Sequence, residues 1–391
     1  MRIGKTVTTE FAAITIGSST INPHSPAGTV RTPGGSSSGS GASVGDCQIP
    51  VALTTQTGGS TIRPASFNGV YGLKPTWGAV SREGQKFYSL LLDTLGWYGR
   101  SVQDLSLLAD VFNLHDDEPS TFKSVRGAKI AVCRTDNWRH AGEGTKAALE
   151  KAKTLLQAHG AVLEEVALPP SFADIPEWHR VLLATDGRAG FLPEHRVAKD
   201  RLHVSLSTYI DLPEFTHKQQ LAAQDGIAAL RPEFDRIAAG YDAVLTASVV
   251  DEAPEGLEFT GDAVFCAMWT VRTDALPVST VKSQLAVPIC PGGVSRLARC
   301  RAETCSNTSF VVMLRHRSAV TWREECIIIL TCWRLHRHCT SPSSICRAFR
   351  ARQACLLVCP SSRPASGTDT CLRWPKLWAV FSRLRGDGRG M

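Results

Sequence analysis

Residues 33–76 read PGGSSSGSGASVGDCQIPVALTTQTGGSTIRPASFNGVYGLKPT, and this stretch decides the fold. It contains two Gly/Ser segments, residues 34–41 and residues 57–60, which an apolar segment joins. Glycines let the backbone approach a ligand closely, and successive N–H groups in such a turn can bind an anion. A serine that ends the turn could attack a carbonyl while the amides of residues 57–60 hold the oxygen that becomes negative. Acyl transfer requires this arrangement.

The alternative interpretation of the first Gly/Ser segment is a flexible linker, for which this composition is typical. The runs at residues 50–53 and 68–73 argue against a linker, because they are typical of buried strand and turn. A serine hydroxyl is a weak nucleophile until a base takes its proton, and Ser/Lys pairs are one known solution. Composition alone therefore indicates a Ser-dependent acyl-transfer site and goes no further.

The ordered motifs around these segments resemble the amidase signature family of serine hydrolases, which cleave C–N amide bonds. The resemblance rests on GGSSSGS, TQTGGS, RPASF, NGVYGLKPT and WGAVS within residues 34–81, and it continues through residues 92–97 and 100–102. It implies an α/β fold with a large mixed sheet covered by helices on both faces, incomplete in this chain. Residues 128–168 independently show a strand–helix–strand order, which is typical of an α/β sheet.

The resemblance also implies a Ser–Ser–Lys triad. By position, the acyl-ester nucleophile is Ser60, and the second serine, which lies in a cis peptide and relays protons, is Ser36. Many members of the family carry Asp where this chain has Gln56, a difference that bears on substrate preference rather than on chemistry. No metal or cofactor is implied. The oxyanion hole would consist of the backbone amides of Thr57, Gly58, Gly59 and Ser60.

The third member of the triad is expected several dozen residues before the first Gly/Ser segment, in a motif like Val-Lys-Asp. Lys5 is the only lysine before Ser36, and its segment, residues 4–12, resembles the element that follows the family's lysine. Lys74 occupies a position that is structural in the family. We therefore expect a chain that is truncated at its N-terminus, lacks the triad lysine and has little or no amidase activity, because removing a triad member costs orders of magnitude in rate.

Charge and cysteine content divide the chain of 391 residues into a body, residues 1–275, and a tail, residues 276–391. Residues 291–391 carry a net charge of +12 (16 Arg and one Lys against five acidic residues), which leaves −5 for the rest of a chain whose total is +7. Ten of the 13 cysteines lie at or beyond Cys290, and the few in the body suit a reduced compartment. The body is expected to be a partial amidase signature domain.

Three interpretations of the tail remain open. We favour a wrong reading frame or a retained intron, which would make the tail irregular, disordered or mispredicted. An Arg-rich nucleic-acid-binding extension would suit the charge, but no fold motif supports it. A zinc module ranks second, ahead of that extension, although no Cys-x-x-Cys pair is present, and its clustered candidates are Cys332, His336, His338, Cys339 and Cys346.

Several local patterns in the body predict structure rather than chemistry. A helix is expected behind the first Gly/Ser segment, another after a capping box at residues 101–104, and strands at residues 162–168 and 241–246. Residues 171–240 are expected to form helices interrupted by Pro193, Pro213 and Pro232. His24 is expected to be a surface or loop residue, Arg63 to lie in an ion pair or on the substrate, and residues 115–118 to form an acidic turn rather than a metal site.

The functional hypothesis is hydrolysis of a small-molecule amide, without a nucleic-acid partner. No apolar run approaches the ~18 residues of a membrane span, and no secretory h-region is visible, so a cytoplasmic location is expected. The competing hypothesis is a non-catalytic amidase-like pseudoenzyme or a ligand-binding remnant. A third is an amidotransferase subunit that handles aminoacyl-tRNA. The identity of the substrate and the oligomeric state stay open.

Overall fold

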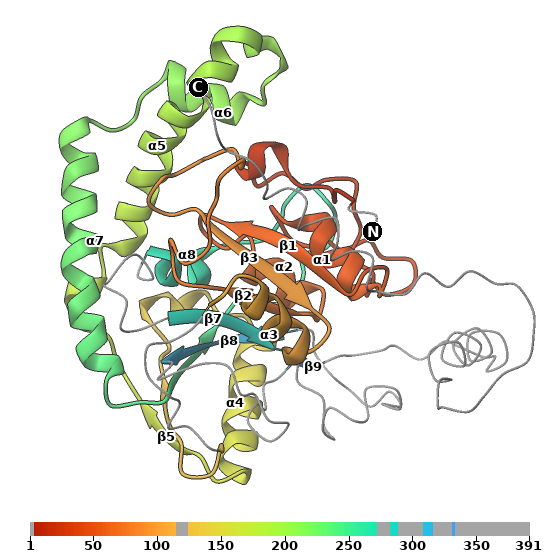
Figure 1. The fold of residues 1–391 in the computed structure, drawn as a ribbon, viewed down its shortest axis with the longest axis vertical. Coiled ribbons are helices and arrows are strands. Elements are labelled where there is room, and N and C mark those ends of the chain that lie inside the picture. The colour runs from red at the N-terminus through yellow and green to blue at the C-terminus, as the bar shows by residue number, and fades with distance from the viewer. Residues whose placement is uncertain (1–3, 115–123, 272–281, 288–307, 316–330, 333–391) are drawn as a thin grey trace, which may run out of the picture. The chain divides into compact units, whose positions relative to one another are not determined.

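The computed structural model describes residues 4–114, 124–271, 282–287, 308–315 and 331–332 (Figure 1). All of these residues belong to one unit, residues 1–336. Within this part of the chain, no helix is long and apolar enough to cross a membrane.

A single mixed sheet organises the unit, in the strand order β1-β3-β2-β7-β8-β6-β4-β5, with β9 beside β8. One half is antiparallel and consists of β1 (Val51–Gln56), β3 (Thr94–Gly99) and β2 (Tyr71–Lys74). The other half is parallel and consists of β6 (Ala243–Ala247), β4 (Lys129–Val132) and β5 (Val162–Glu165). The two halves are joined through β7 (Lys282–Val287) and β8 (Thr308–Arg315), and β8 also pairs with β9 (Thr331–Cys332).

These joining strands lie beyond residue 275, where the sequence analysis placed the end of the body. The boundary itself stays a prediction.

Helices cover both faces of the sheet, as predicted. The alternation along β3 shows this, because Trp97 packs against Leu105 of α3 (Val102–Val111) whereas Tyr98 packs with Ile62 of α2 (Ile62–Phe67). The strand register from β2 across β7, β8 and β6 places Val132 of β4 on the same face of the sheet as Trp97. There Val132 packs with α4 (Glu143–Ala158). The opposite face carries α2 together with α1 (Ser38–Gly45), α5 (Ile175–Ala198), α7 (His217–Ala238) and α8 (Val264–Thr270).

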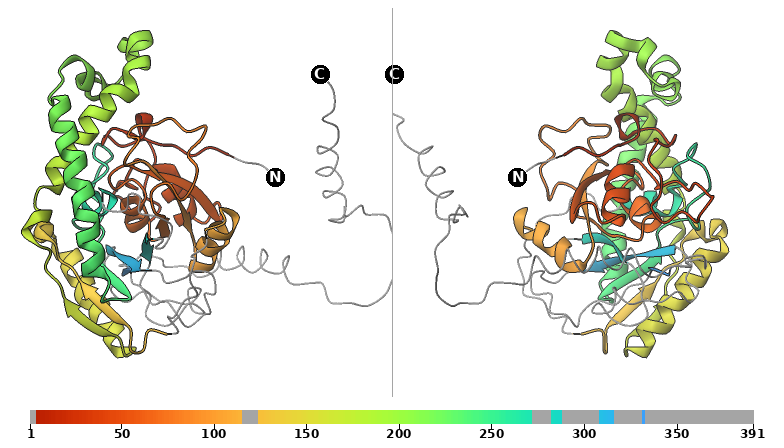
Figure 2. Two further views of the ribbon diagram at one scale, coloured as in Figure 1. Left: turned by 60° about the vertical axis from the view of Figure 1, so that its left-hand side comes forward. Right: turned by 90° about the vertical axis from the view of Figure 1, so that its right-hand side faces the viewer.

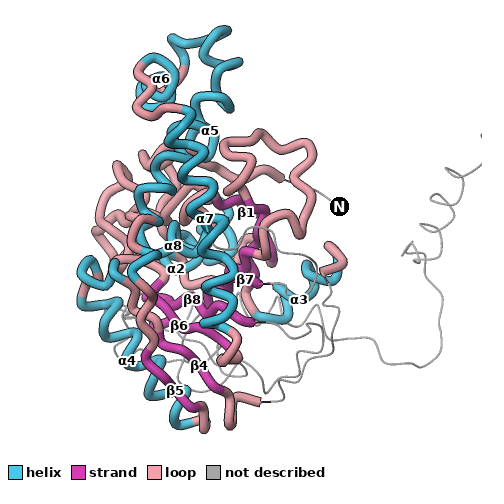
Figure 3. The backbone as a smooth tube through the Cα atoms, turned by 90° about the vertical axis from the view of Figure 1, so that its left-hand side faces the viewer, coloured by secondary structure: helices cyan, strands magenta, loops and turns pink. Residues whose placement is uncertain are grey.

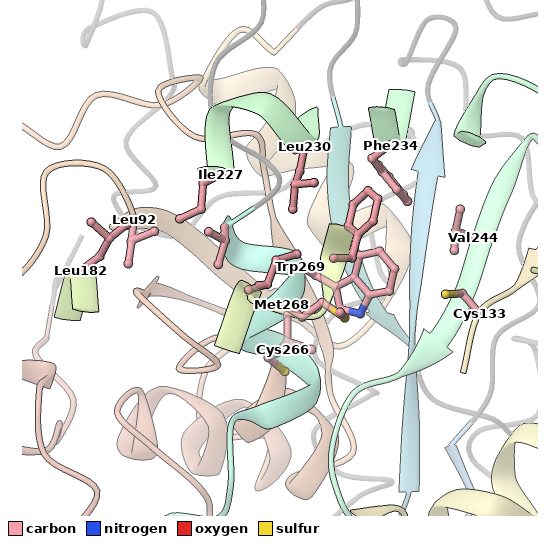
Figure 4. Packing of buried hydrophobic residues seen from close by; sticks show 14 of the residues in the cluster. Leu92, Cys133, Leu182, Ile227, Leu230, Phe234, Val244, Cys266, Met268 and Trp269 are labelled. Carbon is pink, nitrogen blue, oxygen red and sulfur yellow. The ribbon is translucent and has the colours of Figure 1, made fainter. Parts of the chain in front are cut away.

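The largest hydrophobic cluster lies between that second face and the helices α5, α7 and α8 (Figure 4). Trp269 of α8 is fully buried and meets Phe234 of α7 edge to face, with ring centroids 5.7 Å apart. Burying a side chain of this size stabilises the fold by about 1.5–3 kcal/mol or more. Figures 2 and 3 show α5 and α7 side by side, with α6 (Val204–Asp211) at the end of α5. This packing fixes α5 and α8 beside the second Gly/Ser segment.

The helices α5 and α7 run through two prolines that were expected to interrupt them. Pro193 lies inside α5 and Pro232 inside α7, so this prediction is wrong, and only Pro213 falls in a break, between α6 and α7. A proline leaves the carbonyl four residues earlier without its helical N–H partner. Both prolines are exposed, as are the two residues four positions earlier, Ala189 and Ala228, so water can satisfy the freed carbonyls.

The other helix and strand predictions are confirmed in type. The helix behind the first Gly/Ser segment is α1, and the expected strands at residues 162–168 and 241–246 are β5 and β6. The start of α3 differs in one detail. The Ser101 hydroxyl accepts the Asp104 amide (3.1 Å), but the Asp104 carboxylate accepts the amide of Arg100 (2.9 Å) instead of returning to Ser101.

Candidate active site

The first Gly/Ser segment leads into α1, and its Ser36 is buried, with an exposed fraction of 3%. The Gly35–Ser36 peptide bond is cis. The Ser36 carbonyl accepts the amides of Thr9 (3.3 Å) and Ser38 (2.8 Å), whereas its Oγ has no hydrogen-bond partner among the described residues. A Cβ on Gly35 would come within 2.6 Å of the Thr260 methyl group, so only glycine permits this close approach.

The second Gly/Ser segment links the end of β1 to the start of α2 and leaves Ser60 partly exposed. Within the described ranges, the amides of Gly58, Gly59 and Ser60 donate to no backbone carbonyl. Three adjacent donors therefore remain available next to the Ser60 hydroxyl, as an oxyanion hole requires.

Gln56 supports this loop from inside the protein. Its side chain is fully buried, and its Oε1 accepts the amides of Thr61 and Ile62, each at 2.9 Å. Its Nε2 donates to the Thr270 hydroxyl (2.8 Å), which in turn donates to the Gly58 carbonyl (2.6 Å). Gln56 thus acts on the geometry of the loop, since it is both donor and acceptor there, which a carboxylate cannot be.

Arg63 and Tyr98 tie the two Gly/Ser segments together. The Arg63 amide donates to the Gly59 carbonyl (2.9 Å), and its guanidinium donates to the Gly35 carbonyl (2.7 Å). The Tyr98 hydroxyl donates to the Thr61 carbonyl (2.6 Å) and faces the Ser37 hydroxyl, while burial raises the pKa of Tyr98. Burial lowers the pKa of Arg63, whose side chain is only 4% exposed. Arg63 therefore has a structural role, but through hydrogen bonds rather than the predicted ion pair, since no salt bridge among the described residues includes it.

Two residues that sequence reasoning did not single out hold the start of the loop. The Thr57 carbonyl accepts Nε2 of His179 from α5 (3.0 Å), and the Thr57 hydroxyl donates to the Asp93 carboxylate (2.6 Å). Burial lowers the pKa of His179 and raises that of Asp93. Asp93 lies within residues 92–97, which are part of the resemblance described above, but no role was assigned to it. No sequence signal marks His179, which looks like any histidine on a buried helix face.

The lysines near the site have other surroundings. Lys74 is fully buried on β2, and its Nζ donates to the Pro75 carbonyl (3.0 Å). Lys5 is exposed. Since the Ser36 hydroxyl has no partner among the described residues, neither lysine hydrogen bonds to it.

The part of the chain that the structure describes brings no three His, Cys, Asp or Glu side chains together as metal ligands. The acidic residues 115–118 and the side chains proposed for a zinc module in the tail lie outside that part. Those two predictions therefore stay predictions.

Comparisons with known proteins identify a matching family and similar sequences. A family model described as amidase matches residues 1–291. A glutamyl-tRNA(Gln) amidotransferase subunit of Carboxydothermus hydrogenoformans is 38% identical over 196 residues, which are 46% of this chain and 40% of that protein. The corresponding protein of a Synechococcus strain is 40% identical over 185 residues, 43% of this chain and 36% of that protein. The alignments thus span about two fifths of these relatives.

Solved structures share the fold. A glutamyl-tRNA(Gln) amidotransferase subunit of Thermotoga maritima has a TM-score of 0.60 and 23% identity, covering 80% of this chain and 69% of that chain. The native peptide amidase of Stenotrophomonas maltophilia has a TM-score of 0.56 and 23% identity, covering 81% of this chain and 70% of that chain. At these identities the likeness shows the fold alone.

Proposed function

The chain belongs to the amidase family, and from that premise we propose that Ser60 is the nucleophile of an amide-hydrolysing site. Ser60 Oγ attacks the amide carbonyl, and the oxygen that becomes negative binds the amides of residues 57–60. The C–N bond then breaks, and the amine leaves with a proton that passes through Ser36. Water hydrolyses the resulting ester and regenerates Ser60. The substrate class we propose is a small-molecule amide, and the location is the cytoplasm.

One observation carries this proposal. The buried Ser36 hydroxyl has no partner among the described residues, and the segment that holds it is tied to the Ser60 loop through Arg63. A buried polar group without a partner costs about 1–3 kcal/mol, so such groups are kept where they have a function. A proton relay between Ser60 and a leaving amine is such a function.

We further propose that the described residues supply the serines and the oxyanion donors but not the base. Amide cleavage needs a protonated leaving group, whereas a p-nitrophenyl ester releases a stable phenolate without one. We therefore expect the full chain to be acylated by p-nitrophenyl acetate and to cleave an acyl anilide slowly or not at all.

A stopped-flow burst tests the nucleophile. We expect a p-nitrophenolate burst from the full chain that Ser60→Ala abolishes and that Ser205→Ala, an exposed serine on α6, leaves intact. A burst of equal amplitude in the Ser60→Ala chain would refute the assignment. Anilide cleavage at an ordinary enzymatic rate that depends on Ser60 would refute the proposal that the described residues do not supply the base.

A second candidate function follows from the names of the curated relatives. They are subunits of a glutamyl-tRNA(Gln) amidotransferase, so this chain could take its ammonia from glutamine and work with other proteins. Ammonia release from glutamine that requires Ser60 would favour this function. Turnover of aryl amides and esters without glutamine turnover would favour the small-molecule amidase.

A further inference from the structure

His179 reaches the oxyanion loop from α5, a helix far away in sequence. Its side chain is 8% exposed, and Nε2 lies 3.0 Å from the Thr57 carbonyl oxygen. A Cβ on Gly58 would come within 3.2 Å of the His179 ring, so the ring packs closely along the loop. His179 therefore hydrogen bonds to Thr57 and also packs against the backbone of Gly58.

The partner atom decides the protonation state of this histidine. A carbonyl oxygen only accepts hydrogen bonds, so Nε2 must carry the proton. Burial lowers the pKa of His179, which keeps the ring neutral and leaves this one N–H as the donor. A neutral donor holds Thr57 without placing a charge next to the developing oxyanion.

Asp93 holds the same residue from its side chain. One carboxylate oxygen accepts the Thr57 hydroxyl (2.6 Å), and the other accepts the amides of Tyr88 (2.8 Å) and Ser89 (3.2 Å). With 3% exposure, Asp93 is too buried to exchange these partners for water. Its position is thereby fixed by the loop that precedes β3.

The helix α5 reaches Thr57 by a second path. Asp186 follows His179 by seven residues, which places both on one face of α5. The Asp186 carboxylate accepts the Ser89 hydroxyl and the side-chain amide of Gln220 from α7 (3.0 Å), and Ser89 donates its amide to Asp93. The carbonyl and the hydroxyl of Thr57 are thus both anchored to α5.

We propose that His179 and Asp93 form a clamp on Thr57, and that this clamp positions the amides of Gly58, Gly59 and Ser60 for the oxyanion. The proposal rests on the proposed function of Ser60. His179 and Asp93 are positioning residues, since they act through Thr57. A misplacement of about 1 Å in a reacting group can cost about a hundredfold in rate, so a loosened loop should react far more slowly.

The test is the rate at which a fluorophosphonate probe modifies Ser60 in the full chain. His179→Leu keeps the volume but removes the donor, and we expect the rate to fall about ten- to a hundredfold. His179→Gln places an amide N–H the same number of bonds from Cα as Nε2, so it should restore the rate to within about threefold of the original. Arg188→Ala, on the exposed face of α5, is the control and should not change the rate.

Hydrogen exchange of the peptide that contains residues 57–60 separates the clamp from the proposed function. We expect faster exchange in His179→Leu than in the original chain or in His179→Gln. Equal labelling rates in the Leu and Gln variants would overturn the clamp. If the original chain takes no label, the assignment of Ser60 as nucleophile is refuted, and hydrogen exchange alone tests the clamp. In that case faster exchange only in the Leu variant supports the clamp, and equal exchange in all three proteins overturns it.

Discussion

Ser36 and Ser60 share a site but differ in their surroundings. Ser60 is partly exposed next to free amide donors, whereas Ser36 is buried and its hydroxyl has no partner in the described part of the chain. Chemistry and stability therefore make opposite demands on Ser36. The two serines were assigned from resemblance, and some of the contacts that hold their segments come from residues more than 200 positions away: Thr260 lies against Gly35, and Thr270 donates to the Gly58 carbonyl.

Removing the Ser36 hydroxyl should reduce reactivity without reducing stability. In Ser36→Ala we expect the free energy of unfolding to stay constant or to rise by up to about 1 kcal/mol, because an unsatisfied buried group disappears. Labelling of Ser60 should slow by about a hundredfold or more, as for the loss of a general acid–base group. Urea unfolding and probe kinetics measure the two effects.

Ser38→Ala is the matched control, since the Ser38 hydroxyl donates to the Gly34 carbonyl (2.8 Å) in the same segment. It should lose about 1 kcal/mol of stability. A larger loss of stability in Ser36→Ala than in Ser38→Ala would contradict the account of Ser36.

His24 predicts a dependence of stability on pH. It packs on the end of α2, where Nε2 meets the Asn68 carbonyl (3.1 Å), and burial lowers its pKa from 6.5 to about 4. Because the pKa of His24 is lower in the folded state, the contribution of neutral His24 to the free energy of unfolding is complete above pH 6.5 and is lost as the pH falls toward 4. The size of the effect is about 3 kcal/mol.

Urea unfolding between pH 7 and pH 4, compared with His24→Gln, isolates this contribution, because all other titrating groups are shared. The original chain should lose about 3 kcal/mol more than the variant over this range. Parallel pH profiles for the two proteins would show that His24 is not buried in the neutral form.

At the scale of the elements, the site depends on how closely α8 packs against the second Gly/Ser segment. A Cβ on Gly59 would lie 3.1 Å from the Cβ atoms of both Ala263 and Cys266. Gly59→Ala should therefore cost about 1–3 kcal/mol through overpacking and should slow labelling of Ser60, because α8 or the loop must move. Gly240→Ala is the control, since a Cβ there meets nothing within 4 Å. Equal melting temperatures for the two variants would contradict this packing.

Most elements of the body could be predicted from the sequence, and the failures have physical causes. Periodicity located α3 and α4, since each turns an apolar stripe toward a core cluster, and short apolar or alternating runs located β4 to β6. The prolines of α5 and α7 misled the prediction because a proline on an exposed face costs a helix less than one inside the core. His179 was not predictable, since its role depends on the contact of α5 with a loop more than 100 residues earlier.

At the scale of the whole molecule, the mixed sheet was predictable from resemblance, but the strand order was not. The strands β7 and β8 join the antiparallel and parallel halves, and they come from residues whose composition shows no sustained period. The helices α5, α7 and α8 close the face on which the two Gly/Ser segments meet, so the core and the site depend on the same packing.

The core that closes this face predicts a coupling between stability and reactivity. Trp269→Phe should cost about 1–3 kcal/mol, because it removes buried volume beside Phe234 on the helix that also touches Gly59. Labelling of Ser60 should slow in the same variant. Unchanged labelling with reduced stability would show that α8 does not transmit core packing to the loop.

The measurement that tests the central claim most directly is the position of the covalent adduct after the full chain reacts with a fluorophosphonate probe. Peptide mapping by mass spectrometry identifies the modified serine. The account predicts a single adduct on Ser60 that disappears in Ser60→Ala and forms more slowly in Ser36→Ala. An adduct on another serine, or one that persists in Ser60→Ala, would contradict the assignment of the nucleophile and of the loop that serves it.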